Sequence, residues 1–336
     1  MIEFHDAERE TWDTVFQQFD EANFLQSWEW GDMQTLLGNR VIRRVVSANN
    51  APVGLLQATV KNARRGRYLE LPSGPLIDWR QPDLVDELFV ELTDIARKER
   101  CVFVRLRPQL PDETSYRQLF AQHGLGLSPM HLIADHTSIV DITSNDNTLL
   151  KNMRQQTRYE VRRADKRGVT VRIDTSAEIT DTFHTIQVKT AQRQGFIPPS
   201  SSYLRSCMQA LGDHARIYRA DKDGQLLNLG LVIMYGHEAA YFEAASTPEA
   251  RREPGAYAII WQAMRDAREA GLTRFNLWGT APADQPDHRF GGVTTFKRGF
   301  GGEDVNYLPA HDLVINRMRY RFNWLIETVR KKRRKL

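Results

Sequence analysis

The sequence of 336 residues contains only two cysteines, Cys101 and Cys207, and nine histidines. Both cysteines lie in apolar stretches, where a small hydrophobic side chain serves equally well. Two cysteines cannot form a disulfide framework or a cysteine-rich zinc site. The histidines show no HExxH or similar ligand spacing. We therefore expect chemistry that uses no metal and no other bound cofactor.

Long apolar runs are also lacking. None approaches the roughly 20 residues that a helix needs to cross a bilayer, and the first ten residues are acidic and unlike a signal peptide. The hydrophobic fraction of 41% and the charged fraction of 26% are typical of a globular protein. We expect a cytoplasmic protein, and its length is suited to two domains.

The net charge of +4 is modest but unevenly distributed. Six consecutive basic residues, from Arg330 to Lys335, stand at the end of the sequence. Such a run is commonly a solvated tail. It can also attract RNA phosphates or an anionic membrane, by roughly 1 kcal/mol per basic residue near the surface. We therefore predict peripheral contact with the inner face of the membrane as one role for this tail.

The order of predicted elements occurs twice along the chain. In the first half, strands at 41–47 and 53–61 form a hairpin, followed by a strand at 67–71, a helix at 84–96 and a strand at 102–107. The corresponding elements of the second half are at 217–220, 227–235, 239–245, 259–270 and 274–277. We predict an α/β (α+β) protein that contains two copies of one β-hairpin, β, α, β module.

A charged amphipathic helix is predicted between the two copies. Its apolar stripe consists of Leu150, Met153, Val161 and Ala164. Its basic stripe consists of Lys151, Arg154, Arg158, Arg162 and Lys166. Such a face is either simply solvated or a surface that binds phosphates. A last helix is predicted at 313–329, before the basic tail, and we expect it to pack on the first domain because a lone helix of this length is marginal.

The repeated module resembles the core of the GNAT fold, in which the helix after the central strands opens with a glycine-containing loop that holds the pyrophosphate of CoA. Residues 252–257, Arg-Glu-Pro-Gly-Ala-Tyr, stand at this place in the second copy. Tyr257 replaces a small residue there, and Pro254 removes one N–H donor. The first copy has no glycine at its helix start. These departures disfavour acyl-CoA as the donor.

Three motifs, in this order and spacing, resemble the FemABX family over essentially the whole chain. They are Leu-Gln-Ser-Trp-Glu-Trp-Gly at 25–31, Thr-Arg-Tyr-Glu-Val-Arg at 157–162 and Gly-Val-Thr-Thr-Phe-Lys-Arg-Gly-Phe-Gly-Gly-Glu at 292–303. The resemblance implies transfer of an amino acid from aminoacyl-tRNA to the stem-peptide amine of a peptidoglycan precursor, either UDP-MurNAc-pentapeptide or lipid II. Such an aminoacyltransferase forms the interpeptide bridge of the cell wall. The amine attacks an activated ester, which requires oxyanion stabilisation but no covalent enzyme intermediate.

The resemblance also assigns site residues. Lys297 matches a lysine that offsets the oxyanion charge, although a lysine beside a Gly-rich turn can be a plain surface residue. Tyr241 matches a tyrosine near the substrate cleft, although an aromatic residue in a half-buried strand commonly just packs. The substrate-binding residues expected from the resemblance and from the basic stripe are Arg107, Trp30, Arg154, Arg158 and Arg162.

This chain departs from the family at the phosphate-binding positions. The lysine expected after the tryptophan motif is absent from the segment 32–34, and an arginine expected after residue 196 is replaced by Ile-Pro-Pro. Arg107 stands where one relative has an aspartate. Either phosphate binding has been rebuilt from Arg107, Arg154 and Arg158, or the precursor differs.

The predicted organisation has three parts. Residues 1–140 form a GNAT-like domain that binds the precursor, residues 141–310 form a second one with the catalytic lysine and a tRNA-facing surface, and residues 311–336 form a helix that returns to the first domain, plus the tail. One alternative is an N-acyltransferase that uses acyl-CoA or a carrier-bound acyl group on another amine. Another is a non-catalytic relative that binds RNA or membrane.

Overall fold

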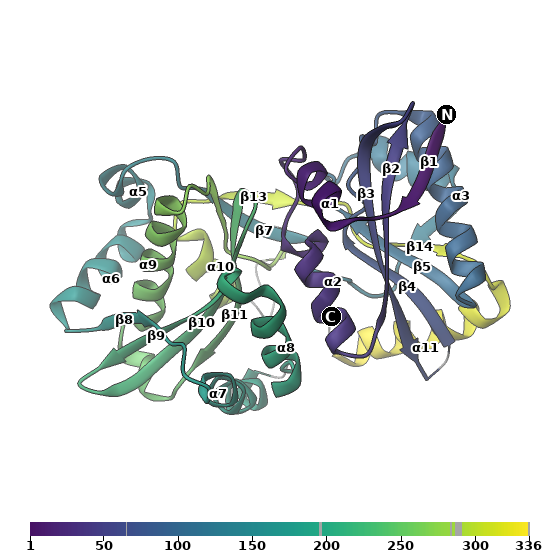
Figure 1. Ribbon diagram of the computed structural model, residues 1–336. Helices are drawn as coiled ribbons and strands as arrows, with labels where there is room; N and C mark the ends of the chain where they lie inside the picture. The colour runs from purple at the N-terminus through teal and green to yellow at the C-terminus, as the bar shows by residue number, and fades with distance from the viewer. Residues whose placement is uncertain (65, 195–196, 283, 286–290, 335–336) are drawn as a thin grey trace. The chain divides into compact units, whose positions relative to one another are not determined.

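The computed structural model describes residues 1–64, 66–194, 197–282, 284–285 and 291–334 (Figure 1). The chain divides into two compact units. The first consists of residues 1–135 together with 306–336, and the second of residues 136–305. The second unit is therefore inserted into the sequence of the first. No helix among the described residues is long and apolar enough to span a bilayer.

The first unit is built on a seven-stranded sheet with the order β1-β2-β3-β4-β5-β14-β6. The strands are β1 (Ile2–Asp6), β2 (Arg40–Ala48), β3 (Ala51–Ala63), β4 (Gly66–Ser73), β5 (Cys101–Pro108), β6 (Leu125–Leu127) and β14 (His311–Val314). The helices are α1 (Arg9–Phe16), η1 (Phe24–Gln26), α2 (Trp28–Leu36), α3 (Pro82–Lys98), α4 (Thr114–Gln122) and α11 (Arg317–Arg334). Neighbouring strands are antiparallel except β4 and β5, which are parallel and joined through α3.

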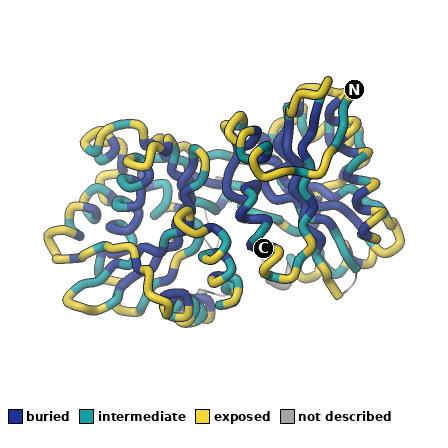
Figure 2. The backbone as a smooth tube through the Cα atoms, viewed as in Figure 1, coloured by how far each residue is buried: buried dark blue, intermediate teal, exposed yellow. Residues whose placement is uncertain are grey.

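The apolar face of α3 forms the main core of this unit. Its buried side chains recur at spacings of three and four residues and pack with β2 to β5 and with Phe120 of α4. Pro82 suits the first turn because that turn does not require its N–H. The helix predicted at 84–96 lies within α3. Figure 2 shows the strands of each unit as largely buried, with the exposed residues concentrated in turns and on outer helix faces.

The second unit repeats this arrangement with a sheet ordered β13-β7-β12-β11-β10-β9-β8. The strands are β7 (His136–Asp141), β8 (Thr170–Ile173), β9 (Ala215–Lys222), β10 (Gln225–Tyr235), β11 (Glu238–Ser246), β12 (Arg274–Asn276) and β13 (Glu303–Asn306). The helices are α5 (Asp146–Asn152), α6 (Gln155–Lys166), α7 (Ile179–Gln194), α8 (Ser201–Leu211), η2 (Gly212–His214), η3 (Glu249–Arg252), α9 (Gly255–Glu269) and α10 (Gly291–Arg298). β11 and β12 are parallel and joined through α9, as β4 and β5 are through α3. The predicted duplication is confirmed.

Two predicted helices differ from the structure. The expected helix over 150–166 is two helices, α5 and α6, because Met153 and Arg154 adopt extended ψ angles of 148° and 143°. The expected helix over 313–329 begins only at Arg317, because Leu313 and Val314 lie in β14. In both cases contacts far along the chain stabilise the break. The Arg154 N–H donates to the Gly299 carbonyl at 2.9 Å, and β14 pairs with β5 and β6.

Candidate active site

A cavity of about 680 Å³ lies in the second unit where β11 and β12 part. β11 pairs with β12 only from Glu238 to Ala240, although β11 continues to Ser246. The continuing part of β11 lines the cavity together with the first turn of α9 and with α10. Its principal side chains are Asn228, Tyr241, Glu243, Tyr257, Phe296 and Lys297.

Lys297 lies in the last turn of α10 and is half-buried. Its ammonium donates to the Gly279 carbonyl at 2.7 Å, which holds it at the cavity wall. Burial lowers the pKa of Lys297 to about 8, and the charge of Glu243 partly opposes this shift. Near neutral pH the group is therefore a cation with little solvation, the state in which it interacts most strongly with a negative charge.

Glu243 is a site residue that the sequence analysis missed. Burial raises its pKa to about 7, against the opposing effects of a hydrogen bond from Gln187 of α7 and the charge of Lys297. A β-bulge in β11 sets its direction: Val232 and Leu231 of β10 pair with Tyr241 and Glu243, and Phe242 is the extra residue. The available signal was an acidic residue inside the apolar run 239–245.

Tyr241 belongs to the apolar core under α9 and also lines the cavity. Its ring lies against the backbone of Gly230, where an added Cβ would be 2.7 Å from a ring carbon. Burial raises the pKa of its hydroxyl group, which therefore stays protonated near neutral pH. Tyr241 thus packs as a core residue and also forms part of the cavity wall.

The first turn of α9 forms one end of the cavity. The N–H groups at the start of a helix have no acceptor within the helix and favour an anion. Gly255 fits here because a Cβ would come within 2.3 Å of Asn228 Oδ1. The Tyr257 ring packs edge-on against Phe296, at 4.8 Å between centroids, and also contacts Phe300. The tyrosine that departs from the CoA-binding pattern therefore anchors α10, which carries Lys297.

The basic stripe is divided between α5 and α6. Arg154 and Arg162 are exposed, as are Lys151 and Lys166. Arg158 is half-buried, and its guanidinium donates to the carbonyls of Leu150, Lys151 and Met153, the last groups of α5. Arg158 therefore caps a helix in this structure, while Arg154 and Arg162 are available to a ligand.

The two predicted binding residues of the first unit lie in its interior. Arg107, at the end of β5, is buried and donates to Gln109 and to the Ala134 carbonyl, with its guanidinium 4.3 Å above the Tyr307 ring. Trp30 of α2 is buried, and its ring packs edge-on against Phe24. As placed, both side chains stabilise the unit, and a binding role for them stays a prediction.

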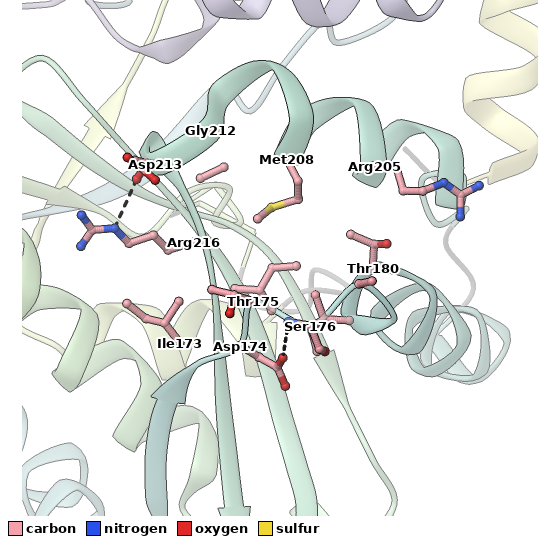
Figure 3. Close-up of a pocket in the computed structure, with 14 residues that line it drawn as sticks. Ile173, Asp174, Thr175, Ser176, Thr180, Arg205, Met208, Gly212, Asp213 and Arg216 are labelled. Carbon is pink, nitrogen blue, oxygen red and sulfur yellow. Dashed lines mark hydrogen bonds between the residues drawn. The ribbon is translucent and has the colours of Figure 1, made fainter.

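A second cavity, of about 710 Å³, lies between the start of α7, α8 and β9 (Figure 3). It contains none of the predicted residues. Two of its charged groups have protein partners: the Arg216 guanidinium donates to the Asp213 carbonyl, and the Asp174 carboxylate accepts from the Ser176 N–H and lies 3.2 Å from an arginine. We therefore take the cavity at Lys297 as the candidate active site.

Comparison with known proteins bears on both units. Residues 7–123 match the FemAB family, and residues 151–298 match the acetyltransferase (GNAT) domain. The aminoacyltransferase FemA of Staphylococcus epidermidis is 20% identical over 79% of this chain and 84% of the relative. The lipid II:glycine glycyltransferase of Staphylococcus aureus is 22% identical over 95% of this chain and 93% of the relative. The predicted resemblance to the FemABX family is confirmed.

Solved structures support the same fold for this chain. The crystal structure of FemX matches with a TM-score of 0.85 at 20% identity, over 97% of this chain and all of that one. A tandem GNAT protein from the clavulanic acid biosynthesis pathway matches with a TM-score of 0.58 at 14% identity, over 94% of this chain and 99% of that one. The prediction of two GNAT-like domains is confirmed, and this protein is an acyltransferase.

Proposed function

We propose that this protein is a FemABX enzyme that transfers an aminoacyl group from aminoacyl-tRNA to the stem-peptide amine of a peptidoglycan precursor, UDP-MurNAc-pentapeptide or lipid II. The observation that carries the proposal is the Lys297 ammonium, held at the wall of a cavity that ends at the first turn of α9. The lipid II:glycine glycyltransferase, which covers nearly the whole chain, points to the same class of acceptor.

In the proposed reaction the neutral amine attacks the ester carbonyl that joins the amino acid to the tRNA ribose. The C–N bond forms, and the carbonyl oxygen becomes an oxyanion that the Lys297 ammonium stabilises. The C–O bond then breaks, and the ribose oxygen leaves as a hydroxyl group with the proton that the amine loses. The amine attacks the ester directly, so no nucleophilic side chain is required.

The tRNA donor would bind to the exposed cations of α5 and α6. Arg154 and Arg162 are the two that we propose as phosphate contacts. The exposed Lys151 and Lys166 extend the same basic surface. The tail from Arg330 to Lys335 offers further positive charge, although Lys335 lies outside the described residues. Cations in such a row bind phosphates without reading sequence.

One assay tests donor and acceptor together. The protein is incubated with a mixture of charged tRNAs and UDP-MurNAc-pentapeptide, and the precursor is analysed by mass spectrometry. The expected result is a mass increase of one amino acid residue that disappears when the tRNA is left uncharged. No increase on either UDP-MurNAc-pentapeptide or lipid II would contradict the proposal.

Transfer from acyl-CoA is the second candidate, because residues 151–298 match the GNAT acetyltransferase domain. Calorimetric titration with CoA distinguishes this candidate from transfer of an aminoacyl group from tRNA. The Tyr257 ring stands where the CoA-binding loop requires a small residue, and it is fixed there by Phe296. We therefore expect no micromolar binding of CoA. A non-catalytic role would be excluded by transfer activity that is lost in Lys297→Ala.

A further inference from the structure

Helix α11 carries an apolar stripe that does not contribute to the packing of the first unit. Met318, Phe322, Leu325 and Val329 follow one another at spacings of four, three and four residues, which places them on one face of the helix. These four side chains are between 43% and 85% exposed. In Figure 1, α11 is the yellow helix beside the sheet of the first unit.

The opposite face of α11 holds the helix in place. The Tyr320 hydroxyl donates to the Asp312 carboxylate at 2.9 Å, and the Glu327 carboxylate accepts from Arg105 at 2.8 Å. Asn323 between them is buried. Tyr320, Asn323 and Glu327 also recur at three and four residues, about half a turn from the apolar stripe. The stripe is therefore exposed because other residues already fix the orientation of the helix.

Arginines flank the stripe on both sides. Arg317, Arg319, Arg321 and Arg330 are all exposed. The only acidic residue of α11 is Glu327, and it lies on the packed face against Arg105. The outward surface of the helix thus combines large apolar side chains with positive charge and no negative charge. The chain continues past it into further basic residues.

We propose that this face of α11 binds an anionic lipid surface. The apolar side chains would enter the boundary between headgroups and acyl chains, while the flanking guanidinium groups bind lipid phosphates. The helix would lie on the bilayer, since no described helix can span one. A second copy of this chain fits poorly, because a two-fold contact would bring arginines against arginines. RNA would use the cations but leave Phe322 and Leu325 in water.

Membrane binding by α11 is separate from the proposed transfer reaction, because a protein can bind vesicles without catalysing that reaction. The test is co-sedimentation with vesicles of phosphatidylcholine that either contain or lack phosphatidylglycerol. The protein should sediment with the anionic vesicles only, and the double variant Phe322→Ser, Leu325→Ser should bind at least about tenfold more weakly. The matched control is Val90→Ser, Leu127→Ser, which removes two side chains of similar exposure, 56% and 59%, from α3 and β6.

The charges and the stripe are tested separately. Arg319→Ser, Arg321→Ser should weaken binding at low salt and have little effect at about 0.5 M salt, where surface charges are screened. A chain shortened to end at Val329 retains the stripe and should keep part of the binding. Circular dichroism and transfer to UDP-MurNAc-pentapeptide should be unchanged in Phe322→Ser, Leu325→Ser.

Three results would overturn the proposal. The first is equal vesicle binding by wild type and Phe322→Ser, Leu325→Ser. The second is a wild-type dimer in light scattering that this variant converts to a monomer, which would make the stripe an interface between copies. The third is a loss of tRNA binding by this variant without a loss of vesicle binding. None of these results depends on whether the transfer reaction occurs.

Discussion

Lys297 combines a positive charge with a pKa of about 8, close to the pH at which the reaction would run. Replacing it with methionine keeps the length of the side chain and removes the charge. We expect the transfer rate of Lys297→Met to fall by at least about a hundredfold, with little change in precursor affinity, because an oxyanion exists only in the transition state. Single-turnover kinetics and equilibrium binding measure the two effects. Wild-type activity in Lys297→Met would remove this residue from the mechanism.

Glu243 extends the pH range in which Lys297 is charged, against the larger effect of burial. Its carboxylate raises the pKa of the lysine, so Glu243→Gln should lower that pKa below about 8. A required cation is present below its pKa and lost above it, so the wild-type rate, corrected for the ionisation of the acceptor amine, should decline as the pH rises through about 8. In Glu243→Gln this decline should begin at lower pH.

A pH profile of single-turnover rates checks this expectation, and Lys297→Arg is the control. Its guanidinium stays charged, so any activity that remains should show no decline near pH 8. Deprotonation of the acceptor amine raises both rates alike with pH, so a wild-type rate that does not fall relative to Lys297→Arg through this range would contradict the role of Lys297 as a cation.

At the scale of single elements, the start of α9 depends on the absence of a side chain at Gly255. A Cβ there would meet Asn228 Oδ1 at 2.3 Å, and Asn228 is buried and donates to Ser246. We expect Gly255→Ala to lower the free energy of unfolding by about 1–3 kcal/mol. Gly292→Ala in α10 is the control, because nothing lies within 4 Å of its added Cβ. Urea denaturation should show no loss of stability, and up to about 1 kcal/mol of gain, for this control.

The basic surface of α6 gives a second prediction at this scale. Arg154→Glu, Arg162→Glu should weaken tRNA binding and reduce its salt dependence, because each phosphate that is no longer neutralised lowers the slope by roughly one unit. Arg158 is left unchanged because it caps α5. The control Arg97→Glu, Lys189→Glu makes the same charge change at exposed positions of α3 and α7. If a salt titration gives the same tRNA affinity for both double variants, the stripe is merely solvated.

Periodicity predicted the regular elements well where local sequence determines them. In the hairpin strands the apolar residues alternate with polar ones, and in α3 and α9 they recur at spacings of three and four. Each pattern is visible within a single segment of the sequence. The break at Met153 and Arg154 was missed because neither proline nor glycine marks it, and its stabilising partner, Gly299, is distant in sequence. β14 was missed for the same reason. Its apolar residues were predicted to begin the last helix, but in the structure they pair with β5.

The candidate site was predictable only in part. Lys297 was found through the family motif, since a lysine before a glycine-rich segment has no distinctive pattern of its own. Glu243 could not be paired with it, because their proximity depends on the bulge in β11 and on the position of α10. Arg158 appeared equivalent to its neighbours in the basic stripe until the end of α5 placed three carbonyls around it.

At the scale of the whole molecule, the C-terminal segment is fixed to the first unit by buried charge. Arg105 makes two hydrogen bonds of 2.8 Å to Asp312, which is fully buried, and a third to Glu327. Arg105→Met would leave the carboxylates without their cation. We expect it to lower the free energy of unfolding by about 3–5 kcal/mol.

Thermal and urea unfolding of Arg105→Met test this expectation. Arg97→Met is the control, because it removes an exposed arginine whose ion pair with Asp94 is worth at most about 1 kcal/mol. If Arg105→Met and Arg97→Met lower the free energy of unfolding by similar amounts, the buried ion pairs of Arg105 contribute no more to stability than a surface pair.

The position of β14 also has a consequence for synthesis on the ribosome. β14 lies between β5 and β6, but residues 311–314 follow the complete sequence of the second unit. While the nascent chain emerges, one edge of β5 therefore stays unpaired until β14 has been synthesised. An unpaired edge favours aberrant pairing with other chains. The second unit can complete its fold in the meantime. The unit that begins the chain is the last to be finished.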